Sequence, residues 1–166
     1  MEEITLPPKA QTQTQPQPVV GFEPTQVRQF TVFLENRVGR LQQLVRAFEE
    51  NAARIVAIAI EESAEATLVR LVCSKPDLGR VLLKEHGFAF AESDVLAVEL
   101  PERTTQPLIS ICSALLTAEI NIHYAYPLLL NPRVPSLVLN VDEPTLAAQI
   151  LIRKGFTLIG ESDLKD

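Results

Sequence analysis

The residues best suited to bind a small molecule lie in the stretch Leu34–Leu41, which reads LENRVGRL. An alternating run from Val27 to Leu34 precedes it and a helical pattern follows it, so a strand-to-helix turn is predicted. The N–H groups in a helix's first turn have no partner within the helix and carry the positive end of its dipole. Gly39 would let a ligand approach the backbone closely. The turn is therefore either a tight connection or a binding site for a small anion.

Composition limits the classes of function. The chain has 166 residues, which fits one ordinary domain or two small ones. Its net charge is −6 and its pI is near 5.0, so no basic surface is implied and no nucleic acid partner is expected. No apolar run approaches the roughly 20 residues that span a bilayer. The acidic N-terminus, Met1-Glu2-Glu3, is unlike a secretion signal. These features predict a cytoplasmic protein without a membrane partner.

Residues that commonly carry catalysis or bind metal are sparse. Cys73 and Cys112 lie far apart, which argues against a disulfide framework and fits a reducing compartment. Both fall on inward patterns, so we expect buried, inert thiols. Two cysteines and two histidines at these spacings predict no metal site, and His86 before Gly87 reads as a helix end. No G-x-S-x-G, P-loop, HExxH or dinucleotide fingerprint is present, so neither an enzyme nor a cofactor is predicted.

The first half of the chain begins with a segment rich in Gln and Pro, residues 1–25, which we expect to be a disordered or extended arm. It is either a solvated tail or carries a short docking segment around Val19, Val20 and Phe22. The pattern then predicts strand, helix, strand, strand, helix and strand. The predicted strands are Val27–Leu34, Ala53–Glu62, Ala66–Cys73 and Phe88–Glu92, and the helices follow Gly39 and Pro76.

The second half repeats this order, with strands at Val95–Leu100, Asn121–Leu129 and Ser136–Val141 and a further helix from Pro144 to before Gly155. The halves also match residue by residue. Leu41 matches Leu108 and Leu44 matches Ile111, in both cases 67 positions further along (108 − 41 and 111 − 44). Such an internal repeat determines the fold before any single motif does.

A split βαββαβ unit is ferredoxin-like, with two helices on one face of a four-stranded sheet. We therefore predict an α+β fold with domains at residues 26–94 and 95–166. Their sheets are expected to lie side by side as one antiparallel eight-stranded sheet with helices on one face, because this hides two edges. The strands IVAIAI and LVRLV are apolar on both faces. A homodimer or a metabolic enzyme partner is therefore expected to cover the open sheet face.

Two tandem βαββαβ repeats with Asn36-Arg37-x-Gly39-x-Leu41 after the first strand resemble the ACT domain, a small regulatory module that binds amino acids. The resemblance covers residues from about 27 to 166 and is greatest to stand-alone tandem ACT proteins of bacteria. It implies a sensor of a free amino acid that lacks catalysis and signals to a metabolic enzyme or regulator. A regulatory small subunit of acetohydroxyacid synthase, responding to a branched-chain amino acid, is the alternative. A small ferredoxin-like enzyme is a second alternative, although it lacks catalytic groups.

In that family the ligand lies between two ACT units, near the loop of one and the second strand of the other. Only the first repeat keeps the loop, since Arg103 and Gln106 stand where Asn36 and Gly39 would align. Only the second opens its second strand with Asn-Ile. The resemblance therefore implies one composite site per chain, unless Asn36 only caps its helix. The predicted ligand-binding residues are Leu34, Asn36, Arg37, Val38, Gly39, Arg40, Leu41, Asn121, Ile122 and His123.

Overall fold

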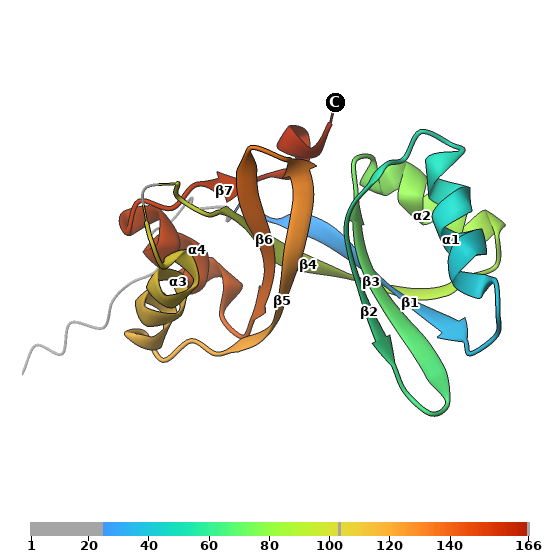
Figure 1. The fold of residues 1–166 in the computed structure, drawn as a ribbon, viewed down its shortest axis with the longest axis horizontal. Helices are drawn as coiled ribbons and strands as arrows, with labels where there is room; N and C mark the ends of the chain where they lie inside the picture. Colours follow the sequence, from blue (N-terminus) through green and yellow to red (C-terminus); the bar gives the residue numbers. More distant parts are fainter. Residues whose placement is uncertain (1–24, 103, 166) are drawn as a thin grey trace, which may run out of the picture.

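The computed structural model describes residues 25–102 and 104–165, and it confirms the repeated βαββαβ order (Figure 1). The predicted arm lies outside the described residues except for Thr25. The elements are β1 (Val27–Glu35), α1 (Arg40–Glu49), β2 (Ile55–Glu62), β3 (Ala66–Cys73), α2 (Pro76–Glu85), β4 (Ala89–Glu99), α3 (Pro107–Leu116), β5 (Ile122–Asn131), β6 (Val134–Val141), α4 (Pro144–Arg153), β7 (Leu158–Ile159) and the 3-10 helix η1 (Glu161–Leu164).

Helix boundaries follow local sequence signals. Helices α2, α3 and α4 each begin at a proline, whose fixed φ suits the first helical position. Gly87 and Gly155 follow α2 and α4 with φ of 69° and 85°, a left-handed conformation that glycine adopts without strain. The predicted helix stop at His86-Gly87 is therefore present, and His86 Nδ1 lies 2.9 Å from Leu82 O at the helix end.

The sheet is closed, and the predicted open eight-stranded sheet is wrong. Six strands form a ring in the order β1-β3-β2-β5-β6-β4, and β4 pairs back with β1. All these pairings are antiparallel, and β7 lies beside β4. The contact between β2 and β5, at Ala57 and Leu128, joins the outer strands of the two repeats. Closure into a barrel leaves fewer free edges than an open sheet, and it hides the apolar strand faces.

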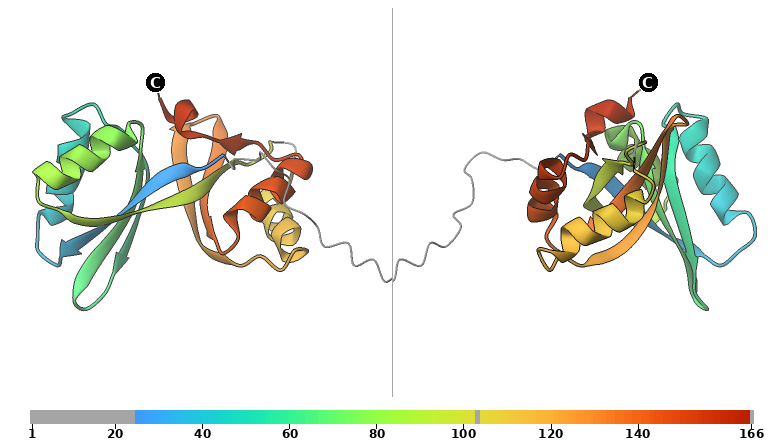
Figure 2. Two further views of the ribbon diagram at one scale, coloured as in Figure 1. Left: turned by 180° about the vertical axis from the view of Figure 1, so that it is seen from behind. Right: turned by 60° about the vertical axis from the view of Figure 1, so that its left-hand side comes forward.

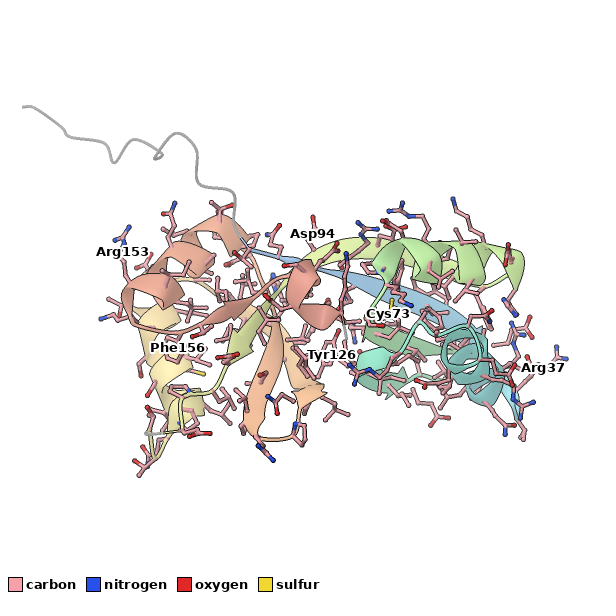
Figure 3. The ribbon with its side chains drawn as sticks, turned by 90° about the horizontal axis from the view of Figure 1, so that it is seen from above. Arg37, Cys73, Asp94, Tyr126, Arg153 and Phe156 are labelled. Atoms are coloured by element: carbon pink, nitrogen blue, oxygen red, sulfur yellow. The ribbon has the colours of Figure 1, made fainter. Side chains whose placement is uncertain are left out.

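Strand β4 belongs to both repeats. Its segment Ala89–Val95 pairs with β1, and its segment Leu96–Glu99 pairs with β6. The sequence pattern predicts two separate strands here, Phe88–Glu92 and Val95–Leu100, with the polar residues Ser93 and Asp94 between them. That part of β4 is exposed, however, so polar side chains are tolerated in an unbroken strand. The predicted boundary between residues 94 and 95 falls inside this strand, close to the labelled Asp94 (Figure 3).

The apolar residues form three cores. Helices α1 and α2 pack on the outer face of the first repeat, and α3 and α4 pack on that of the second, so the two helical layers lie on opposite sides of the barrel (Figure 2). The third core fills the barrel interior and contains residues of both repeats, among them Val27, Val56, Val95, Val138 and Leu164. The sheet face predicted to be open to a homodimer or enzyme partner is thus buried within the chain itself.

The two cysteines occupy different environments. Cys73 is buried under α2, where a Cβ on Gly79 would lie 2.8 Å from its Sγ. Cys112 is exposed, which corrects the prediction that it is buried. The buried face of α3 is formed by Ile111, Ala114 and Leu115. A residue directly after Ile111 is turned about 100° around the helix axis, away from that face.

Candidate functional site

The predicted loop Leu34–Leu41 joins β1 to α1. Leu34 is buried at the end of β1, whereas residues 35–39 are exposed. Gly39 is the N-cap of α1 with φ of 89°, and a Cβ placed on it would meet nothing within 4 Å. No side chain caps this helix end and no acidic residue lies in its first turn. The loop therefore presents open backbone at the positive end of a helix dipole, as an anion site requires.

Asn36 does not cap α1, which removes the simplest structural role proposed for it. Its Nδ2 instead donates a 3.4 Å hydrogen bond to Glu62 Oε1, at the end of β2. Arg37 points outward at the far end of the first repeat (Figure 3) and pairs with Glu35 at 2.9 Å. Val38 is fully exposed. The polar groups at the tip of the loop are thus exposed, and each already has a side-chain partner that a ligand would have to share or displace.

Arg40 and Leu41 turn away from the loop tip. The Arg40 guanidinium lies over the ring of Phe88, 5.0 Å from its centroid, and its Nη1 donates a 2.9 Å hydrogen bond to Gln43 Oε1. Leu41 packs against the first core. These two side chains therefore support the fold around the loop, and only their backbone lies near the predicted site.

The second part of the predicted site opens β5. The Asn121 backbone makes two hydrogen bonds with Asp142. Its N–H donates to the Asp142 side chain at Oδ1 (3.1 Å), and its carbonyl accepts from the Asp142 backbone N–H (3.2 Å). Its side chain is exposed. Ile122 packs partly into the second core and His123 is exposed. The Asn121 and His123 side chains are therefore accessible at the start of β5.

The structure brings the loop and Asn121 to the same end of the barrel but does not place them side by side. Leu34 and Glu62 both lie opposite Thr67, so the end of β1 is level with the hairpin between β2 and β3. Strand β5 runs antiparallel to β2, so it starts at this same end (Figure 1). Strands β3 and β2 separate β1 from β5 in the ring. A ligand touching both parts would have to extend past the β2–β3 hairpin.

Polar side chains of the two repeats do meet inside the barrel, at residues outside the predicted site. Gln29 of β1 is fully buried, and its Oε1 accepts a 2.7 Å hydrogen bond from the Tyr126 hydroxyl. Its Nε2 donates to the Tyr124 hydroxyl at 2.8 Å and to Ser93 Oγ at 3.2 Å. Burial raises the pKa of Tyr126, so its hydroxyl stays a donor. Figure 3 shows Tyr126 at the middle of the molecule, between the helical layers.

A cation lies beside this cluster. The Arg70 guanidinium lies 4.3 Å from the centroid of the Tyr124 ring, and its Nη1 donates a 2.8 Å hydrogen bond to Glu61 Oε2. One feature of the sequence indicates this cluster, because the polar residue Gln29 lies among the apolar residues of β1. Because the described hydrogen bonds use both ends of the Gln29 amide, the cluster joins the two repeats and has the character of a structural contact.

Two ferredoxin-like repeats fused through one strand define a closed pair of domains. The profile of the ACT domain pair matches residues 25–166, and the chain belongs to that family. Pairs of this kind are typical of amino-acid-binding regulatory domains. No curated protein matches the chain in sequence. Across the described residues 25–102 and 104–165, no helix is long and apolar enough to cross a membrane, and no group of three or more His, Cys, Asp or Glu could hold a metal ion.

Solved structures share the fold. Protein BT0572 from Bacteroides thetaiotaomicron is 26% identical with a TM-score of 0.77, and the match covers 85% of this chain and 96% of that one. The regulatory subunit of aspartate kinase from Thermus thermophilus, in its ligand-free form, is 10% identical with a TM-score of 0.53, covering 79% and 93%. A structure of aspartokinase alpha and beta subunits is 16% identical with a TM-score of 0.51, covering 78% and 91%.

Proposed function

We propose that this protein is an amino-acid-binding regulatory protein with no catalysis of its own and one composite ligand site per chain. The site would combine the Leu34–Leu41 loop with Asn121 and its neighbours at one end of the barrel. The observation that carries the proposal is the uncapped N-terminus of α1, where Gly39 leaves the backbone open. Membership of the ACT domain pair family supports the choice of ligand.

The zwitterion of an amino acid fits the groups at this end of the barrel. Its carboxylate would bind the first-turn N–H groups beyond Gly39, because they carry partial positive charge and no carboxylate competes there. Its ammonium would bind the Glu62 carboxylate, which lies 3.4 Å from Asn36 Nδ2. The Asn121 side chain can both donate and accept. Because β3 and β2 separate it from the loop, it would contact the side-chain end of an extended ligand rather than the carboxylate or the ammonium.

The regulatory output would be a contact with a metabolic enzyme or regulator. Two structures with a similar fold, the regulatory subunit of aspartate kinase and the aspartokinase alpha and beta subunits, support this kind of role. The sequence pattern predicts that the partner covers an open sheet face, but the side chains of that face form the core inside the barrel. The partner would therefore contact a surface outside the barrel, and binding at the exposed loop would be sensed there.

Isothermal titration calorimetry of the full chain with each of the twenty amino acids tests the proposal. We expect one ligand per chain with a dissociation constant on the order of micromolar to millimolar, because a free amino acid has few atoms with which to offset its lost freedom. Asn36→Ala and Asn121→Ala should each weaken binding about ten- to a hundredfold. The matched control is Asn51→Ala, whose Nδ2 bonds Ala47 O at the far end of α1. Unchanged affinity in both site variants would exclude the composite site.

A further inference from the structure

A cavity of about 330 Å³ lies in the second repeat, away from the loop and the barrel interior. It is bounded by the segment after β4, one face of α3 and the C-terminal end of α4. Its chemically distinctive lining residues are Ser110, Ser113, Thr117, Lys154 and Phe156. Phe156 lines the cavity and lies at the opposite end of the molecule from Arg37 (Figure 3).

The first repeat fills the equivalent space with its own side chains. Phe88 is the counterpart of Phe156, 68 positions earlier in the chain (156 − 88). Arg40 lies over the Phe88 ring at 5.0 Å and is held by Gln43 at 2.9 Å. One turn further along α1, Arg46 pairs with Glu50 at 3.5 Å. The Phe88 ring is therefore covered by Arg40 and by the stacked ring of His86, whose centroid lies 6.4 Å away.

Short side chains explain why the second repeat is hollow at this place. The positions 67 residues after Arg40, Gln43, Arg46 and Glu50 hold Pro107, Ser110, Ser113 and Thr117. A proline and three small hydroxyl residues thus replace two guanidinium groups, an amide and a carboxylate. The backbone framework is the same, so the missing side-chain volume is left as a cavity above the ring.

The lining favours an anion. Lys154 supplies a cation, and among the described residues no carboxylate lines the cavity. Ser110 Oγ donates to Gln106 O at 3.1 Å and Thr117 Oγ1 donates to Ser113 O at 2.9 Å, so these hydroxyls are fixed to the helix. Ser113 also lines the cavity and can supply a donor hydroxyl.

An apolar hollow continues the cavity between α3 and α4. It measures about 300 Å³ and shares Ala114, Thr117 and Lys154 with the first cavity. Its other lining residues are Ala118, Leu146, Ile150 and the cation Arg153. Ligand pockets commonly measure about 300–1,000 Å³, so each hollow is at the small end of that range. A cation followed by an aliphatic wall matches a molecule with a charged head and a short hydrocarbon tail.

We propose that this cavity binds a small aliphatic carboxylate. The carboxylate pairs with Lys154 and the Ser113 hydroxyl above Phe156, and the hydrocarbon part lies between α3 and α4 beside Leu146 and Ile150. The site is separate from the Leu34–Leu41 loop and does not depend on the function proposed for it. In the first repeat the same space is taken by Arg40.

The test uses isovalerate as the probe and maps amide chemical shifts of the ¹⁵N-labelled full chain. We expect saturable shifts in Ser110–Thr117 and Lys154–Thr157, with a dissociation constant on the order of millimolar for so small a ligand. Isopentylamine, which has the same hydrocarbon part but a positive head, should cause no saturable shifts there. Valine differs from isovalerate by its ammonium group. Tighter binding of valine would mean that the assigned site also contains an acceptor for that ammonium.

Two variants localise the binding. Pro107→Arg introduces the residue that covers the ring in the first repeat, and it should weaken isovalerate binding at least about tenfold by filling the cavity. Lys154→Gln, at an exposed position, should weaken it about ten- to a hundredfold by removing the cation. Asn36→Ala should leave isovalerate binding unchanged, which separates this site from the loop.

Three outcomes would overturn the inference. The first is the absence of saturable shifts with either isovalerate or valine at about 10 mM, well above a millimolar dissociation constant. The second is equal binding by Lys154→Gln and the unaltered protein. The third is a set of shifts confined to Leu34–Leu41 and Asn121, which would support the proposed amino-acid site while excluding this one.

Discussion

The two repeats bury equivalent residues but differ in what they place outside the core. Leu44 of α1 and Ile111 of α3, 67 positions apart, are both buried on the inner face of their helix, as are Phe48 and Leu115. Outside the core, the first repeat covers Phe88 with Arg40, whereas the second leaves a cavity beside Phe156. Interior packing therefore fixes the shared fold, and the short polar positions determine which repeat has space for a ligand.

The same contrast applies to the loops that precede the first helix of each repeat. Gly39 gives α1 an open N-terminus, whereas α3 begins with Gln106 as its N-cap and Pro107 in its first turn. Proline lacks an N–H and glutamine adds side-chain volume, so this end of α3 has fewer accessible N–H groups that could bind an anion. The repeats consequently offer different candidate sites, one at a loop and the other on a helix face.

Thiol labelling should give the largest difference between the repeats. Burial raises the pKa of the Cys73 thiol to about 11, whereas Cys112 is exposed. We expect a disulfide reagent such as DTNB to label Cys112 rapidly. Cys73 should react more slowly, by on the order of a thousandfold or more, because the reagent reaches its buried thiol only when the protein unfolds. Cys112→Ser should abolish the rapid phase. Two thiols of equal rate would contradict the assigned burial.

Removing the polar contact between the repeats should have the next largest effect. Gln29→Met deprives the buried Tyr126 hydroxyl of its acceptor, so we expect a loss of roughly 1–3 kcal/mol in the free energy of unfolding. Urea denaturation measures this loss. Gln42→Met, at an exposed position of α1, is the matched control and should change stability by less than about 0.5 kcal/mol. Equal stabilities of the two variants would mean that Gln29 does not join the repeats.

Acid should produce the smallest effect, and it acts mainly on the first repeat. A hydrogen bond from Arg80 lowers the pKa of Glu92 below its ordinary value of 4.5, and one from Arg28 lowers that of Asp77 below 3.8. As pH falls through and below these ordinary values, the unfolded chain binds protons first, so the folded state loses stability.

Glu92→Gln should therefore lower the melting temperature by a few degrees at about pH 6, and this difference should shrink towards about pH 3. Thermal melts followed by circular dichroism at a series of pH values measure it. Glu65→Gln at the exposed β2–β3 turn serves as the control and should show no such convergence. A difference that grows on acidification would contradict the sign of the effect.

The sequence predicted those parts of the fold that depend on local pattern. Helix ends at Gly87 and Gly155 and the repeat of strands and helices follow from residue types a few positions apart. Barrel closure was not predicted, because the pairing of Ala57 with Leu128 depends on edges that are far apart in the chain. The continuity of β4 was missed because polar residues near Ser93 imitate a turn, although they lie in an exposed part of the strand.

The candidate site was predictable only in part. The accessible backbone at Gly39 follows from a glycine beside a helix start, and the structure describes it as open. Asn36 was assigned to a helix cap or a ligand, and its contact with Glu62 could not be foreseen without the pairing of β2 and β3. The cavity beside Phe156 required a comparison of side-chain sizes at equivalent positions, which the sequence contains but which matters only once the two helices are in place.

The shared strand β4 also determines how the two repeats move and melt. Paired domains are commonly joined by a linker, which acts as a hinge and lets each domain turn or unfold alone. Here the main chain passes from one repeat to the other without leaving the sheet, as Ala89–Val95 pairs with β1 and Leu96–Glu99 pairs with β6. Fraying of either repeat would expose its half of the same strand. We therefore expect the pair to unfold as one cooperative unit, and neither half to fold alone when it is cut away.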